Sequence, residues 1–223
     1  MIYVLEPRAG EERLLIKGEL HKYLIKVRRH TLGDILGFRS KESINMLHHY
    51  EIVALEPRVA ELKRIKSEEL EVKSSKNLHI AWCIIDSKSI EKVLASLCEI
   101  GVSRISFITC DRSQKNFKLD FKRFERIVEA SMQQSGRTSI MEFDRYSSIE
   151  SFISEFPQTK VFDFTETILE NTEDFREVLV GCEGGFSQKE KKFLQQQEVF
   201  RLNTPMILRS ESALLAVSSK ILL

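Results

Sequence analysis

The sequence predicts an α/β protein, in which a small β-barrel precedes a larger domain built on a parallel sheet. After residue 78, buried strands alternate with amphipathic helices, the pattern of a parallel sheet with helices on both faces. Before residue 73, short apolar runs are separated by turn residues. The polar segment 67–77 divides the two patterns and is the expected linker. We therefore place the domains at residues 1–72 and 73–223.

The first domain is expected to be a curled sheet with one helix across its end. A helix over 19–29 is predicted because apolar residues recur at helical spacing there. The strands are expected at 2–5, 14–17, 34–38, 44–55 and 59–65.

The second domain is expected to begin with a strand over 78–85, whose nearly continuous apolar run is typical of a strand buried on both faces. A helix over 89–100 follows and ends at Gly101. Further strands are expected at 104–110, 160–164, 177–181 and 199–202, and helices at 120–135, 187–197 and 210–223. A polar connection leads to the segment 149–156, which precedes the strand at 160–164.

The composition is that of an ordinary globular protein, with 42% hydrophobic and 30% charged residues. No apolar run approaches the roughly 20 residues of a membrane span, and acids interrupt the N-terminus where a signal peptide would be apolar. We therefore expect a cytoplasmic protein without a membrane partner. The spacing of Cys83, Cys98, Cys110 and Cys182 favours buried, reduced thiols over metal ligands, so no metal is expected.

The net charge of +1 does not by itself indicate a nucleic-acid partner. Residues 21–30 nevertheless hold four cations and no acid, and the stretch 112–137 is also basic. Both are compatible with phosphate contacts and, equally, with solvated helix faces. The cations of the first run are Lys22, Lys26, Arg28 and Arg29.

The most informative motif is VLVGCEGGFSQKE at 178–190. Its glycines lie between a buried strand and a helix whose start is marked by the capping-box pair Ser187 and Glu190. Ligands of open α/β sheets bind at this end of the strands, so the loop is placed for a cofactor. It matches neither a dinucleotide-binding fingerprint nor a P-loop, and a tight structural turn is the alternative.

Two other stretches favour a binding site. LNTPMILRSESALLA at 202–216 contains a turn at Pro205 and then Ser210, an expected helix N-cap. The apolar helix that follows must be buried in the core or in a subunit interface. EASMQQSGR at 129–137 ends in Arg137, a candidate phosphate ligand or a solvated side chain after a glycine stop.

In this order, the motifs resemble those of the 16S rRNA uridine-N3 methyltransferases, the RsmE family of the SPOUT class. Four segments match the family motifs: Cys98 to Val102, Glu129 to Arg137, Gly181 to Ser187 and Ile207 to Ala213. Three positions depart from the family pattern: Cys182 replaces a proline, residues 203–206 lack a glycine and an arginine, and Ser212 replaces a threonine. These departures affect loop contacts more than the fold.

The resemblance implies a trefoil-knotted α/β methyltransferase domain, a PUA-like RNA-binding barrel, and a homodimer that acts on 16S rRNA or the small ribosomal subunit. It also implies S-adenosylmethionine as the cofactor. The residues that would hold the cofactor are Phe162, Gly181, Glu183, Gly184, Gly185, Leu202, Asn203, Ile207 and Leu208.

Uridine N3 is a poor nucleophile until it loses its proton, so a base or a cation near the developing negative charge should help. Arg209 is the expected cation. Glu183 is a candidate base, although its carboxylate could instead accept bonds from the loop backbone. Arg112 and Arg137 would bind RNA phosphates, together with the cations of residues 21–30.

The sequence leaves three other functions as alternatives. One is a SPOUT enzyme that modifies transfer RNA or a ribose hydroxyl, and another is an inactive RNA-binding relative. A nucleotide-binding oxidoreductase is disfavoured because Asp86, Ser87 and Lys88 stand where its glycine-rich loop would follow the first strand.

Overall fold

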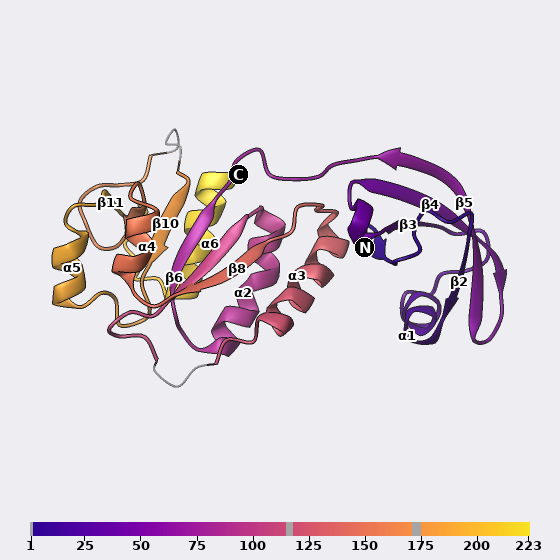
Figure 1. Cartoon of the computed structure of the whole chain (residues 1–223), viewed down its shortest axis with the longest axis horizontal. Coiled ribbons are helices and arrows are strands. Elements are labelled where there is room, and N and C mark those ends of the chain that lie inside the picture. Colours follow the sequence, from indigo (N-terminus) through magenta and orange to yellow (C-terminus); the bar gives the residue numbers. More distant parts are fainter. Residues whose placement is uncertain (1, 115–117, 171–174) are drawn as a thin grey trace. The chain divides into compact units, whose positions relative to one another are not determined.

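The computed structural model describes residues 2–114, 118–170 and 175–223 (Figure 1). It contains two compact units. The first comprises the chain up to Val72 together with Met132–Thr138, and the second comprises Lys73–Ser131 and Ser139–Leu223. The first unit thus includes a short piece from the end of a helix that the sequence assigns to the second domain.

The first unit contains a five-stranded sheet in the order β1-β3-β4-β5-β2. Strands β1 and β3 pair in parallel, and the other neighbours are antiparallel. Alternate residues of β2, such as Leu14 and Ile16, point into a core shared with Phe38, Tyr50 and Leu62. The strands are β1 (Val4–Leu5), β2 (Arg13–Lys17), β3 (Ile35–Arg39), β4 (Met46–Leu55) and β5 (Val59–Glu69).

The helix of this unit differs from the expected α-helix over 19–29. A short helix α1 (Gly18–His21) passes into a π-helix, η1 (Lys22–Val27). The wide turn is closed by bonds from Arg28 N to Tyr23 O and from His30 N to Leu24 O, and Arg29 has a positive φ of 61°. A 3-10 turn, η2 (Lys41–Ser43), precedes β4.

The expected linker at 67–77 was placed too early. Strand β5 continues to Glu69, which pairs with Met46 of β4, and Val72 exchanges hydrogen bonds with Thr138. Backbone pairing with β4 therefore overrides the polar composition of residues 67–69.

The second unit contains a six-stranded, entirely parallel sheet in the order β11-β9-β10-β6-β7-β8. The predicted parallel sheet is confirmed, and its central strand β6 is buried along its whole length, as its apolar run indicated. The strands are β6 (His79–Cys83), β7 (Arg104–Ile108), β8 (Glu142–Tyr146), β9 (Lys160–Phe162), β10 (Glu177–Val180) and β11 (Val199–Phe200).

Helices cover both faces of this sheet. On one face, Trp82 stacks on Phe107, which contacts Phe124 of α3, while the Trp82 indole N–H donates to Ser210 of α6. On the other face, His79 contacts the ring of Phe152 in α4. The helices are α2 (Ser87–Ile100), α3 (Phe121–Ser135), α4 (Ile149–Glu155), α5 (Gln188–Leu194) and α6 (Ser210–Leu222).

Several local predictions are confirmed and two are wrong. Helix α2 ends at Gly101, whose φ is 109°, and Ser187 with Glu190 forms the predicted capping box. Strand β8 was not predicted, because its sequence, EFDRY, lacks the apolar run that marks a buried strand. Ser210 is not the N-cap of α6; Arg209 holds that position, because the Ser210 hydroxyl is bonded elsewhere.

All four cysteines are free and buried. Among residues 2–114, 118–170 and 175–223, no cluster of three acidic, histidine or cysteine side chains could hold a metal ion. Within the same ranges, none of the helices has the length and apolar character needed to cross a bilayer.

Candidate functional site

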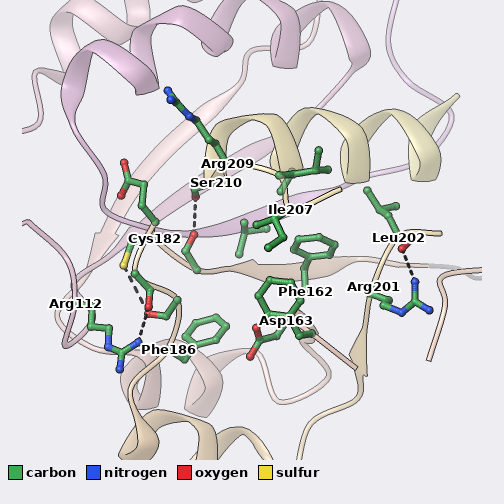
Figure 2. Close-up of a pocket in the computed structure, with 18 of the residues that line it drawn as sticks. Arg112, Phe162, Asp163, Cys182, Phe186, Arg201, Leu202, Ile207, Arg209 and Ser210 are labelled. Atoms are coloured by element: carbon green, nitrogen blue, oxygen red, sulfur yellow. Dashed lines mark hydrogen bonds between the residues drawn. The ribbon is translucent and has the colours of Figure 1, made fainter. Parts of the chain in front are cut away.

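Two bends of the second unit enclose a cavity of about 500 Å³ (Figure 2). The first bend, residues 181–186, follows β10, and the second, residues 202–209, connects β11 to α6. Both lie beyond the carboxyl ends of parallel strands, where open α/β sheets bind ligands. The walls between the bends are formed by Phe162, Asp163, Phe164, Val180, Lys191, Arg201, Ser210, Ala213 and Arg112.

The first bend is held from several sides. Gly185 donates its N–H to Cys182 O over 2.9 Å and has a φ of 64°, which favours glycine. Arg112 Nη1 donates to Gly184 O over 2.5 Å. A Cβ atom on Gly184 would lie 3.3 Å from Arg112 Cβ, so the glycine permits this close packing. These contacts give the first bend a defined shape without help from a ligand.

The second bend has fewer contacts. Thr204 N donates to Leu202 O over 2.9 Å, and Met206 N donates to Thr204 Oγ1 over 3.1 Å. Met206 and Ile207 are 70% and 82% exposed, although both line the cavity. Large apolar side chains this exposed at a cavity are available for a ligand or a partner.

Ser210 links the two bends. Its hydroxyl donates to Gly181 O over 2.5 Å and accepts the indole N–H of Trp82 over 2.8 Å. Trp82 lies in β6 and Gly181 directly follows β10, so both bonding partners belong to the sheet or its edge. Ser210 is itself buried. The start of α6 is therefore fixed directly against the end of β10.

The cavity is rich in charge. Its cations are Arg112, Lys191, Arg201 and Arg209, and its acids are Asp163 and Glu183. Lys191 pairs with Asp163 at 3.1 Å, and Arg201 Nη1 donates to Leu202 O over 3.2 Å. Such a site could hold a small molecule that carries both charge signs on an apolar body.

A group of thiols lies under the first bend. The Sγ atoms of Cys110 and Cys182 are 3.6 Å apart. Contact with the Cys182 and Cys83 thiols lowers the pKa of Cys110, whereas the pKa values of Cys182 and Cys83 are raised, chiefly by their contact with Cys110. Sequence reasoning predicted buried thiols and did not foresee that three of them meet.

The structure brings most of the expected cofactor residues together around this cavity. Asn203 is the exception: it lies on the second bend and is exposed, outside the lining. The expected catalytic residues Arg209 and Glu183 both line the cavity, as does Arg112, which was expected at RNA. The other expected lining residues are Phe162, Gly181, Gly184, Gly185, Leu202, Ile207 and Leu208.

Two features of the cavity were not predicted from the sequence. One is the ion pair of Asp163 with Lys191, and the other is the presence of Arg201 in the cavity wall. Asp163 directly follows β9 and Arg201 directly follows β11. A charged residue immediately after a parallel strand was thus the available signal, since such positions face the ligand edge of the sheet.

The expected RNA-binding cations of the first unit are exposed: Lys22, Lys26, Arg28 and Arg29. Arg28 lies over the ring of Tyr23, 5.3 Å from its centroid, and donates to the Tyr23 hydroxyl over 2.9 Å. Arg137 differs, because it is only 5% exposed. A phosphate contact would require its side chain to turn outward.

Comparison with known proteins gives the context of this site. A family model for the RNA methyltransferase domain matches residues 72–222. Ribosomal RNA small subunit methyltransferase E of Helicobacter pylori is 35% identical over 223 residues, covering 98% of both chains.

Two solved structures share the fold. A Legionella pneumophila protein in complex with the cofactor SAM has a TM-score of 0.77 at 20% identity, covering 98% of this chain and 95% of that one. Ribosomal RNA small subunit methyltransferase E of Neisseria gonorrhoeae, bound to S-adenosyl methionine, has a TM-score of 0.76 at 18% identity, covering 98% and 96%. From the family model and the full-length relative, this chain belongs to the RNA methyltransferase family that includes ribosomal RNA small subunit methyltransferase E.

Proposed function

We propose that this protein transfers a methyl group from S-adenosylmethionine to N3 of a uridine in the 16S rRNA of the small ribosomal subunit. The observation that carries the proposal is that the bends at 181–186 and 202–209 line one cavity. Its volume of about 500 Å³ lies within the usual range of small-molecule sites. Membership of the family supports both the donor and the class of acceptor.

The residues of the cavity fit this donor. Phe162, Leu202 and Leu208 provide apolar surface for an adenine ring. The glycines of the first bend have no side chain between a ligand and the loop backbone, and the acids Asp163 and Glu183 suit its cationic groups. The arginines of the cavity suit its carboxylate.

When bound, S-adenosylmethionine supplies an activated methyl group, so the protein has to align the acceptor and exclude water. Arg209 occupies the N-cap position of α6, lines the cavity and is exposed, and its side chain makes no capping bond, so its guanidinium can turn to a base placed there. A cation at this point would stabilise the negative charge that develops on the uracil oxygens when N3 loses its proton. Glu183, also exposed at the cavity, is the proposed proton acceptor.

The first unit would hold the RNA. We propose that it is a PUA-like barrel that grips phosphates with Lys22, Lys26, Arg28 and Arg29. Arg137, in the segment 132–138 of the same unit, and Arg112, in the second unit, would also contact the RNA. The exposed cations on the π-helix and beside it support this assignment. RNA affinity should fall steeply with salt, and replacing Arg28 and Arg29 by alanine should flatten that dependence. An unchanged salt slope would place the RNA surface elsewhere.

We also propose that the second unit is a trefoil-knotted SPOUT domain that works as a homodimer in the cytoplasm. The exposed Phe164, Met206 and Ile207 at the cavity support a site completed by a second copy. The cytoplasm follows from the proposed substrate, the ribosomal subunit.

The decisive experiment compares the modified nucleosides of 16S rRNA from cells with and without the gene, using mass spectrometry. Loss of 3-methyluridine is expected. Reconstitution with the Arg209→Ala protein should restore little of it, because loss of one preorganised charge at a transition state costs roughly 100-fold in rate. Near-normal turnover by folded Arg209→Ala would remove this residue from the mechanism, and failure of the wild-type dimer to bind S-adenosylmethionine in calorimetry would refute the proposed function.

A further inference from the structure

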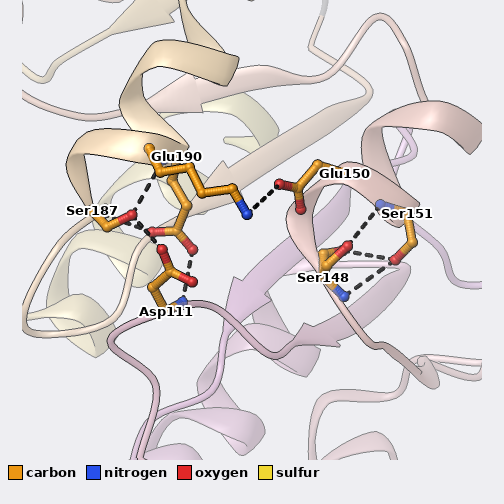
Figure 3. A network of polar contacts seen from close by, with 7 residues as sticks. Asp111, Ser148, Glu150, Ser151, Ser187 and Glu190 are labelled. Atoms are coloured by element: carbon orange, nitrogen blue, oxygen red, sulfur yellow. Dashed lines mark hydrogen bonds and ion pairs between the residues drawn. The ribbon is translucent and has the colours of Figure 1, made fainter.

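The loop after β7 and the start of α5, which follows the first bend, are joined by a network centred on Glu190 (Figure 3). Glu190 is 5% exposed, and both of its carboxylate oxygens accept hydrogen bonds. Oε2 accepts from Ser187 N over 2.7 Å, which is the capping bond of α5. Oε1 accepts from Asp111 N over 2.8 Å, in a loop 79 residues away. A helix cap needs only the first of these bonds, so the second indicates an additional role.

Asp111 is held a second time through its side chain. The Ser187 hydroxyl donates to Asp111 Oδ2 over 2.5 Å and accepts from Glu190 N over 3.2 Å. The three residues therefore form a closed set of bonds between two loops that follow different strands. A closed set of hydrogen bonds of this kind fixes its members more firmly than the separate bonds would.

The residue that follows Asp111 is Arg112, which lines the cavity and bonds to the first bend through its guanidinium. Its one hydrogen bond to a described residue is the bond from Nη1 to Gly184 O. A guanidinium carries five N–H donors, so most of them remain available to a ligand. Fixing Asp111 thus fixes the backbone that carries Arg112 at the cavity wall.

We infer that Glu190 is a positioning residue that acts through Asp111 to hold Arg112 in place for an anionic oxygen at the cavity. The inference rests on the proposed function, which supplies two such oxygens: the carboxylate of S-adenosylmethionine and a phosphate of the RNA. Arginine recognises both groups with paired N–H donors.

The test variant is Glu190→Gln, which has the same shape. Glutamine can accept at one oxygen only, so either the cap or the bond to Asp111 is lost, and an amide N–H group then faces a backbone N–H. Ser151→Ala is the matched control, because it breaks the capping box of α4, whose bonds join Ser148 to Ser151 and involve neither Asp111 nor Glu190. Equal thermal stability of the two variants would separate positioning from loss of a helix cap.

Binding is measured with S-adenosylmethionine, with its decarboxylated analogue, and with a 16S rRNA fragment. Glu190→Gln is expected to weaken binding of one anionic ligand by roughly tenfold. If the carboxylate is the partner, affinity for the decarboxylated analogue stays unchanged; if a phosphate is the partner, only RNA affinity falls.

The double variant with Arg112→Ala decides whether Glu190 acts through Arg112. In that background the Glu190→Gln effect on binding should disappear, because the group being positioned is gone. Independent effects that multiply in the double variant would overturn the inference, as would unchanged binding of all three ligands by Glu190→Gln. Both results could occur in an active enzyme, so they would leave the proposed function standing.

Discussion

The two bends that form the cavity are held in different ways. The first, residues 181–186, is tied by Arg112 and by Ser210, and the start of the helix after it is tied to the loop after β7 by the Glu190 network. The second, residues 202–209, has two local backbone contacts of its own and leaves Met206 and Ile207 exposed. We infer that the first bend is preorganised for binding, whereas the second bend takes its final contacts from a ligand or from a second copy of the chain.

The largest expected effect concerns the sheet under both bends. Burial, and then the charge of Arg104, lowers the pKa of His79 from 6.5 to about 4, so the folded state keeps it neutral while the unfolded chain is protonated. The contribution of neutral His79 to the free energy of unfolding should be fully present above pH 6.5. The free energy of unfolding should then fall by up to roughly 3 kcal/mol as the pH drops from 6.5 to 4. Urea unfolding of wild type and His79→Gln across this range tests it. An equal slope in the variant would assign the acid sensitivity to other groups, including those of the bends.

Ser210→Ala should have the next largest effect, because it removes the link between the bends. It leaves the buried Trp82 N–H and Gly181 O without the hydroxyl, which costs about 1–3 kcal/mol of unfolding free energy. Ser219→Ala, on the same helix, is the control. If both variants unfold at the same urea concentration, the hydrogen bonds of the Ser210 hydroxyl do not stabilise the first bend.

Ile207→Glu tests the second bend. If a second copy covers this side chain, the charge should weaken the dimer at least tenfold, or about 1.4 kcal/mol, as measured by analytical ultracentrifugation. Ile65→Glu, an exposed apolar position of the first unit, serves as the control. A dimer that tolerates Ile207→Glu would leave the cofactor or RNA as the partner of this bend.

Cys182→Pro should have a smaller, stabilising effect, because it returns the first bend to the residue typical of the RsmE family. Proline limits the unfolded chain and should add up to about 1 kcal/mol of stability if the bend already has a compatible φ. Cys182→Ser separates this effect from loss of the sulfur contact with Cys110. A destabilised proline variant would show that the thiol contact, and not loop stiffness, maintains this bend.

The smallest effect is expected from Thr204→Ala. It removes the bond from Met206 N to Thr204 Oγ1 on an exposed turn, so unfolding free energy should change by less than about 0.5 kcal/mol. Thermal unfolding is sufficient to measure this. A loss above 1 kcal/mol would mean that the second bend is organised from within, and the contrast with the first bend would disappear.

Much of this arrangement could be predicted because local signals agreed with each other. Glycine, capping residues and a buried strand together marked the first bend, and Gly101 marked the end of α2. The π-helix at Lys22–Val27 and the hydroxyl of Ser210 escaped prediction, because tertiary contacts decide them. The pairing of Asp111 with Glu190 joins residues 79 positions apart, and no spacing rule reaches that far.

Strand β8 escaped prediction because it carries Glu142, Asp144 and Arg145 where a buried strand would carry apolar residues. It is the last strand on its side of the sheet, and its only strand partner in the described sheet is β7. An outer strand with unpaired backbone groups can recruit strands of other molecules and lead to aggregation. Charges along β8 disfavour that association, so the composition that concealed the strand from prediction also opposes aggregation through this edge.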